Sequence, residues 1–234
     1  MSHPFGPKNA CVAAPDIPAA DLATALGFSH LEPAEWKAGV DFAYDWKQPS
    51  NSGVGVFVTP PLGRWTLCVG TCLFDREKGF AAAISRRLGG REVQYFATHR
   101  VTEGHVLERA INGKLTRYFY DCGCDGEHAE EGEPTPGELA AGYKTNPPDD
   151  ELDELDDSFD YWSANEEFVF AVAGAWSVDP TMIHETFPDA GPGFVGRAAI
   201  GPVVAPFTAP PVPPKRQPPL APTWRDRLRG LWGR

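Results

Sequence analysis

The sequence lacks the apolar segment of about 20 residues that a membrane-spanning helix needs. Its first residues also lack the charged start and unbroken apolar run of a secretory signal. Short motifs of common enzyme chemistry are missing as well: there is no glycine-rich phosphate loop, no Gly-x-Ser-x-Gly elbow and no His-Glu-x-x-His pair. We therefore expect a cytoplasmic protein without an evident catalytic motif.

Cysteine is scarce, and the five cysteines are an odd number in a chain without an export signal, which favours reduced thiols. Cys68 and Cys72 are predicted on one face of a strand, four residues apart, where a mutual disulfide is sterically poor. Cys122, Cys124 and His128 invite comparison with a zinc site, but the paired Cys-x-x-Cys spacing is missing. We expect no bound metal and no cofactor.

What the sequence does contain is a strong separation of charge. The net charge is −11, yet residues 121–160 hold 15 acidic residues against one lysine, and residues 215–234 hold six basic residues against one aspartate. The remainder is close to neutral, so a phosphate-binding surface is not indicated and nucleic acid is not an expected partner.

The fold prediction is organised around a hairpin. Asn112-Gly113 is the strongest short hairpin signal, and it joins predicted strands over residues 105–111 and 114–121. A two-residue turn there places Glu108 opposite Arg117. A sharper hypothesis gathers six polar side chains of this region into a cleft on the sheet, namely His99, Arg100, His105, Glu108, Arg109 and Arg117.

The remaining pattern predicts an α+β fold. The order β-β-α-β-β-β closes most simply as a mainly antiparallel sheet with helices packed on one face. Residues 64–74 are apolar or small on both faces, which is typical of a covered central strand. The predicted helices begin near Pro18, Glu35, Arg76 (capped by Asp75), Thr135 and Ser163, and the other predicted strands span residues 53–60, 64–74 and 91–101. Thr135–Glu138 and Ser163–Glu166 have the form of capping boxes, and the helix after the second carries Phe168, Val172 and Trp176 at one-turn spacing.

Two segments stand apart from this body. Residues 1–198 form the predicted single domain, interrupted by an acidic excursion over residues 144–160. Residues 199–234 form a proline-rich linker that ends in a short basic amphipathic helix over residues 224–234. From Gly191 onward we expect little regular structure outside that helix.

Five blocks resemble an uncharacterised family of actinobacterial and cyanobacterial proteins: WTLCVG, VQYFATHRV, NGKLTRYFYD, EEGEPTPGE and AGAWSVDP. The similarity covers roughly residues 53–183, and its motifs concern the fold, with no catalytic residues to carry over. Some members resemble immunity proteins of contact-dependent toxin systems in size and composition. The chain departs from the family in Cys122-Gly-Cys124, the acidic excursion and the basic tail.

The favoured functional hypothesis is a protein-interaction module, of the immunity, inhibitor or adaptor kind, that binds a partner with a basic surface. The predicted contact residues of the excursion are Asp149, Asp150, Glu151, Asp153, Glu154, Asp156 and Asp157. Those of the tail, which would dock on a partner or a membrane surface, are Trp224, Arg225, Leu228, Leu231 and Trp232. The alternatives are an enzyme that uses the polar cleft and a membrane-peripheral structural component.

Overall fold

The computed structural model describes residues 8–45, 55–74, 76–123, 127–145 and 162–198. These residues form nine strands in one sheet, and every pairing in it is antiparallel. The strands are β1 (Lys8–Pro15), β2 (Phe28–Ala34), β3 (Gly55–Val58), β4 (Trp65–Val69), β5 (Val93–His99), β6 (Gly104–Ile111), β7 (Lys114–Cys122), β8 (Glu127–Glu131) and β9 (Gly193–Ala198).

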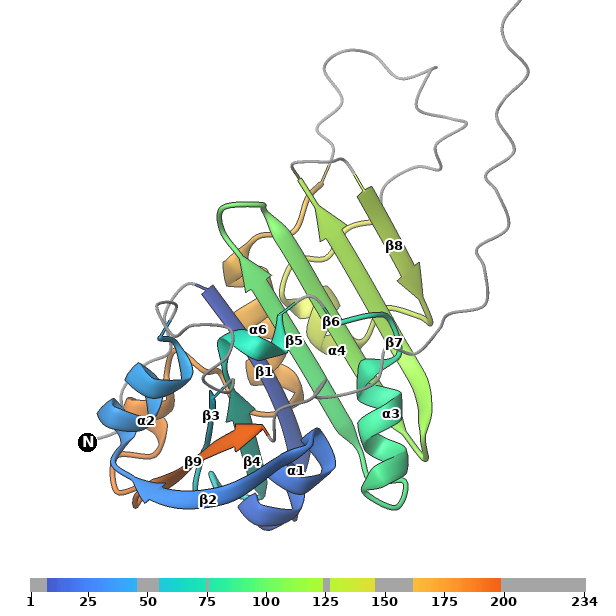
Figure 1. Cartoon of the computed structure of the whole chain (residues 1–234). Coiled ribbons are helices and arrows are strands. Elements are labelled where there is room, and N and C mark those ends of the chain that lie inside the picture. The colour runs from blue at the N-terminus through green and yellow to red at the C-terminus, as the bar shows by residue number, and fades with distance from the viewer. Residues whose placement is uncertain (1–7, 46–54, 75, 124–126, 146–161, 199–234) are drawn as a thin grey trace, which may run out of the picture.

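The strands follow the order β2-β9-β3-β4-β1-β5-β6-β7-β8 across the sheet. Figure 1 shows the sheet running from β2 and β9 at one end to β8 at the other. The first strand of the chain therefore lies in the middle, where it pairs with β4 on one side and β5 on the other. The sequence prediction of an α+β fold with a mainly antiparallel sheet is confirmed.

The predicted placement of helices on one face is wrong, because helices cover both faces. Helices α1 and α3 pack on one face, and α2, α6 and α7 contribute to the core on the other. The cause lies in the central strand: Ala10, Val12 and Ala14 face the first core, while Cys11 and Ala13 face the second. The helices are α1 (Ala19–Leu26), α2 (Trp36–Ala43), η1 (Thr71–Leu73), α3 (Phe80–Arg87), α4 (Pro136–Ala140), α6 (Glu166–Trp176) and α7 (Ile183–Thr186).

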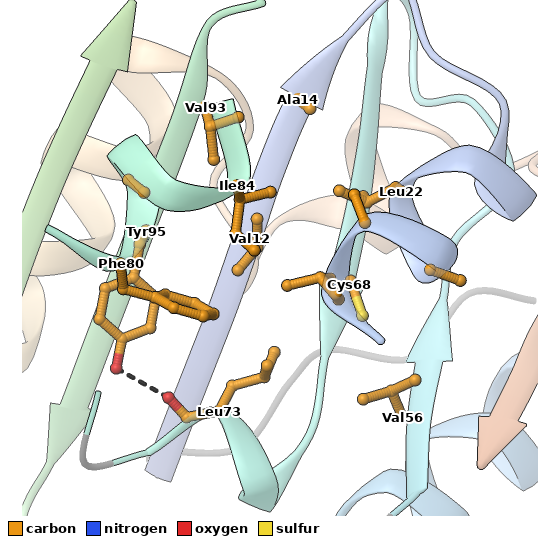
Figure 2. Close-up of a cluster of buried hydrophobic side chains, with 14 of the residues drawn as sticks. Val12, Ala14, Leu22, Val56, Cys68, Leu73, Phe80, Ile84, Val93 and Tyr95 are labelled. Atoms are coloured by element: carbon orange, nitrogen blue, oxygen red, sulfur yellow. Dashed lines mark hydrogen bonds between the residues drawn. The ribbon is translucent and has the colours of Figure 1, made fainter. Parts of the chain in front are cut away.

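The core on the α1 and α3 face consists mostly of small and medium-sized side chains, with Phe28, Phe80 and Tyr95 as its large aromatic members. Figure 2 shows Val12, Leu22, Ile84 and Leu73 converging beneath the two helices. All four are fully buried. Burying a side chain of this size contributes about 1.5–3 kcal/mol, so this layer fixes both helices on the sheet.

The sequence analysis missed strands at both ends of the described chain. Strand β1 contains three alanines, an asparagine and a terminal proline among its eight residues, all of low strand propensity, so it carries no clear strand signal. Strand β9 falls where we expected little regular structure, yet it pairs with both β2 and β3. Tertiary pairing overrides propensity in both places, because each strand is inserted between two neighbours far away in sequence.

The predicted hairpin exists, but its register differs from the prediction. Asn112 and Gly113 both have positive φ angles of 53° and 71°, as the predicted two-residue turn requires. A bulge between Arg109 and Ala110 then shifts the pairing, so that Arg109 lies opposite Arg117 and Glu108 opposite Tyr118. The Thr116 hydroxyl donates a hydrogen bond to the carbonyl of Arg109 at 2.9 Å across the bulge. The predicted Glu108–Arg117 pair is therefore wrong.

Two predicted helix starts also need correction. Helix α3 begins at Phe80, not at Arg76, and its first N–H groups bind a side chain from the sheet. Asp75, the predicted cap, lies outside the described residues. Helix α6 is capped by Asn165, whose side chain accepts from the N–H of Phe168 at 2.9 Å, so the predicted capping box that starts at Ser163 is absent. The capping box of Thr135 and Glu138 is confirmed.

Candidate functional site

The six residues of the predicted polar cleft do not share one surface. Glu108 and His99 lie on the α3 face of the sheet, where His99 contacts the ring of Phe74. The side chains of His105, Arg109 and Arg117 lie on the α6 face. Side chains alternate between faces along a strand, and the bulge reverses the alternation that we expected for Arg117.

Each member of the predicted cleft has a local partner. The Arg109 guanidinium pairs with Glu92 at 2.8 Å, and Arg100 pairs with Glu166 at 3.0 Å. His105 shares a hydrogen bond with Thr98 at 3.0 Å, and its burial lowers the pKa of the imidazole. These contacts hold neighbouring elements together, and they correct the interpretation of a single catalytic cleft.

Glu108 caps a helix from a distance. Its carboxylate accepts hydrogen bonds from the N–H groups of Gly79 at 2.6 Å and Ala81 at 2.7 Å, at the start of α3. The first N–H groups of a helix have no partner within it and carry partial positive charge, so a carboxylate satisfies both needs. Burial nevertheless raises the pKa of Glu108 to about 7, because these bonds only partly offset the loss of hydration.

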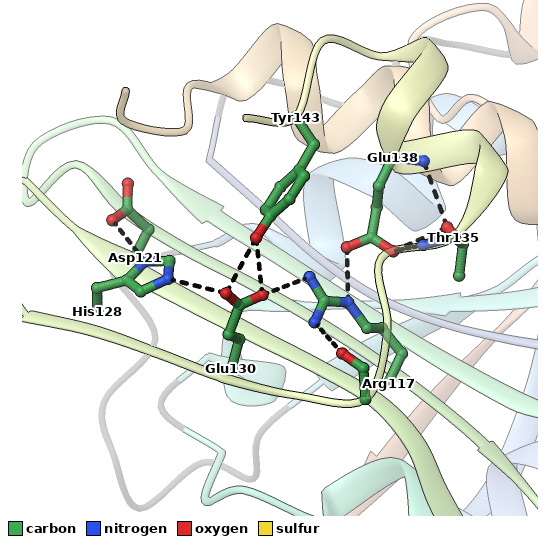
Figure 3. A network of polar contacts seen from close by, with 8 residues as sticks. Arg117, Asp121, His128, Glu130, Thr135, Glu138 and Tyr143 are labelled. Atoms are coloured by element: carbon green, nitrogen blue, oxygen red, sulfur yellow. Dashed lines mark hydrogen bonds and ion pairs between the residues drawn. The ribbon is translucent and has the colours of Figure 1, made fainter. Parts of the chain in front are cut away.

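Arg117 is the centre of a buried polar network between β7, β8 and α4 (Figure 3). Its Nε donates to Glu138 at 2.8 Å, and its Nη1 donates to the carbonyl of Gly132 at 2.7 Å. Its Nη2 lies 2.9 Å from a carboxylate oxygen of Glu130. The side chains of Arg117 and Glu138 are 1% and 0% exposed, so neither charge could lose its partner without a large desolvation penalty.

The same network continues along β8 toward its start at Glu127. The Tyr143 hydroxyl donates to Glu130 at 2.9 Å, and His128 lies 3.3 Å from Asp121. Asp121 also accepts from the hydroxyl of Ser163 at 2.7 Å and from the N–H of Ala164 at 2.8 Å. Figure 3 shows Asp121, His128, Glu130, Tyr143, Arg117 and Glu138 in one chain of contacts. Together with the bonds to Ser163 and Ala164, this chain fixes α4 and the segment before α6 to the sheet.

The contacts of His128 and Asp121 account for the directions in which their pKa values shift. The bond to Asp121 raises the pKa of His128 above its ordinary value. Burial opposes ionisation of Asp121, but the bonds from His128, Ser163 and Ala164 outweigh it and lower the pKa of that carboxyl. Both shifts favour the charged pair of His128 and Asp121, which links β8 to β7.

Strand β8 and the residues directly after it form the acidic edge of the sheet, which we define as Glu127 and Glu131 of β8 and Glu133 beyond its end. Strand β8 pairs with β7 on one side only, and no other strand of the described chain pairs with its outer side. All three side chains are exposed, and Glu131 forms a half-exposed ion pair with Lys78 at 2.6 Å. Such an edge offers unpaired backbone groups flanked by carboxylates.

Sequence reasoning missed the acidic edge. It treated the whole interval 121–160 as one charged stretch, because glutamate is uncommon in strands and EHAEE has only one apolar residue. The predicted contact residues of the excursion, 149–157, and of the tail, 224–232, lie outside the described residues, as does Cys124. Within the described ranges, no three His, Cys, Asp or Glu side chains are arranged to hold a metal ion.

Comparisons of the chain with protein-family models, with curated proteins and with solved structures find no match. Across the described residues, no helix is long and apolar enough to cross a membrane.

Proposed function

We propose that the chain is a protein-interaction module, of the immunity, inhibitor or adaptor kind, that binds a basic partner in the cytoplasm. The partner adds an extended, lysine- or arginine-rich segment to β8. The observation that carries this proposal is the acidic edge, where exposed glutamates border a strand whose outer side is unpaired among the described residues. Strand addition at such an edge supplies main-chain hydrogen bonds, and the charges select the partner.

The charge distribution along the sequence supports the same partner chemistry. Residues 144–160 add eight acidic residues a short distance after the acidic edge. A concentration of one sign of charge speeds the encounter with an oppositely charged protein more than it deepens the affinity. The tail residues 224–234 supply a second contact, with the partner or with a membrane surface.

The alternative of an enzyme with a polar cleft receives less support. Its proposed residues lie on two faces of the sheet, and Glu108 and Arg117 are both engaged in structural contacts. The stable anchoring of β8 by the Arg117 network favours a rigid recognition edge, which lowers the ordering cost of binding.

Strand addition can be tested with a defined probe. The probe is a peptide of alternating lysine and valine, and hydrogen exchange of the full-length chain is measured with and without it. We expect slower exchange of β8 amides and a binding constant that weakens with salt. A second peptide with the same charge, but with prolines at alternate positions, should not protect β8, because proline cannot donate backbone hydrogen bonds.

Charge-reversal variants sharpen the test. Glu127→Lys/Glu133→Lys should weaken binding of the peptide by at least tenfold. The matched control, Glu32→Lys/Glu35→Lys, places the same reversals at and beside β2, the opposite edge of the sheet, and should have little effect. Equal binding by both variants, or protection of β2 instead of β8, would contradict the proposal.

A further inference from the structure

A pocket of about 660 Å³ lies on the α3 face of the sheet, and its rim meets the acidic edge only at the pair of Lys78 with Glu131 among the described residues. We call it the α3-side pocket. Its floor spans three adjacent strands, because Ala97 lies opposite Val106 on β5 and β6, and Val106 lies opposite Tyr120 on β6 and β7. Small-molecule pockets typically have volumes of about 300–1,000 Å³, so this one has room for an organic ligand.

The hollow exists because α3 is short. The helix starts at Phe80, directly over the row in which Tyr95, Glu108 and Tyr118 lie side by side. In Figure 2, Phe80 stands edge-on to Tyr95, whose hydroxyl donates to the carbonyl of Leu73 at 2.8 Å. Beyond this row the pocket is bordered by Thr71 of η1 and by Phe74, and the small side chain of Ala97 leaves space.

The walls of the α3-side pocket are aromatic. Tyr118 and Tyr120 are half-buried and lie on the same side of β7, two residues apart. Burial raises the pKa of both phenols to about 12, so both hydroxyls stay protonated at neutral pH and can donate hydrogen bonds. Phenol rings offer faces and edges against which a flat aromatic ligand can stack.

The rim carries two cations. Arg76 lies over the ring of Phe80 at 5.6 Å, and its buried Nε–H has no hydrogen-bond partner among the described residues. Lys78 lies over the ring of Tyr118 at 4.9 Å, although Glu131 neutralises part of its charge. The exposed Glu77 is also on the rim. Of the two rim cations, Arg76 is the one with a buried donor that has no partner among the described residues, so it has spare hydrogen-bonding capacity. A buried donor without a partner is uncommon, and a carboxylate is the acceptor that fits a guanidinium best.

We propose that the α3-side pocket binds a small planar aromatic carboxylate, with its acid group on Arg76 and its ring between the tyrosines and the Ala97 floor. A phosphate ligand fits less well, since the N–H groups at the start of α3 already bind Glu108. The proposal does not depend on strand addition at the outer side of β8, although Glu131 of the acidic edge pairs with Lys78 on the pocket rim.

Calorimetric titration of the full-length chain with 2-naphthoate tests this assignment. We expect 2-naphthoate to bind and its uncharged analogue 2-naphthamide to bind at least tenfold more weakly. Arg76→Gln should weaken binding of the acid by at least tenfold and leave binding of the amide nearly unchanged. Arg64→Gln is the matched control, because Arg64 also lies over an aromatic ring, that of Trp65, but outside the pocket.

The location is tested separately in the unaltered chain. Amide chemical shifts should change at Ala97, Val106 and Tyr120 on addition of 2-naphthoate. In a separate variant, Ala97→Leu should abolish the binding by filling the floor. Absence of binding, equal binding of acid and amide, or shift changes confined to the α6 face would each overturn the proposal. Failure here would leave the peptide result at β8 unaffected, so the two proposals are tested independently.

Discussion

Glu108 and Arg117 belong to the same hairpin, but the two faces of the sheet accommodate their charges differently. On the α3 face, no described cation makes a hydrogen bond to Glu108, whose carboxylate accepts from two backbone N–H groups instead. On the other face, Arg117 is surrounded by two carboxylates and a carbonyl. A helix N-terminus carries only about half an elementary charge, so it compensates burial less completely than an ion pair does. The pKa of Glu108 rises accordingly, whereas the carboxyl of Glu130 has a lowered pKa because its bonds to Arg117 and Tyr143 outweigh its burial.

The largest effect on stability is expected when the buried ionic network loses its central arginine, Arg117. Arg117→Met should lower the free energy of unfolding by about 3–5 kcal/mol, because Glu138 is left buried without its cation. Chemical denaturation measures the loss. As the control, Arg64→Met removes the exposed pair with Asp16 and should lower the free energy of unfolding by less than about 1 kcal/mol. Equal losses in the two variants would contradict the expected difference between the buried and the exposed ion pair.

A smaller effect, dependent on pH, is expected at Glu108. Its pKa is about 7 in the folded chain and lies near 4.5 when the carboxyl is exposed. Between these values the folded state holds a proton that the unfolded state releases, so the contribution of Glu108 to stability falls as the pH rises from about 4.5 to 7. The total loss is on the order of 3 kcal/mol.

Glu108→Gln should remove this part of the pH dependence. Unfolding free energies measured from pH 5 to pH 8 would then be flatter for the variant than for the unaltered chain. Glu77→Gln, an exposed substitution in the segment before α3, serves as the control and should leave the profile unchanged. An unaltered slope in Glu108→Gln would show that the helix N-terminus compensates the charge fully.

The smallest effect concerns the caps of the two helices. Helix α6 is capped locally by Asn165, whereas α3 is capped by Glu108 from another element. Asn165→Ala should cost about 1 kcal/mol in thermal or chemical unfolding. Glu167→Ala, in the exposed first turn of α6, should change stability by less than about 0.5 kcal/mol. A larger loss of stability from Glu167→Ala than from Asn165→Ala would show that the acidic first turn, and not the Asn165 cap, stabilises the start of α6.

Local patterns in the sequence determined the local structure. The Asn112-Gly113 turn, the capping box of Thr135 and Glu138, and the apolar stripe of Phe168, Val172 and Trp176 all act over a few residues, and all are present in the fold. Each depends on backbone conformation or on one helical turn, so neighbouring residues contain the needed information.

Only the tertiary structure decided which side chains meet. The bulge at Arg109 turns Arg117 away from Glu108 and toward Glu138, and the insertion of β1 and β9 between distant strands builds the two-sided sheet. These outcomes depend on pairing between segments far apart in the chain, where a shift of one residue exchanges the two faces of a strand. The types of residue in the polar network could be read from the sequence, but their partners could not.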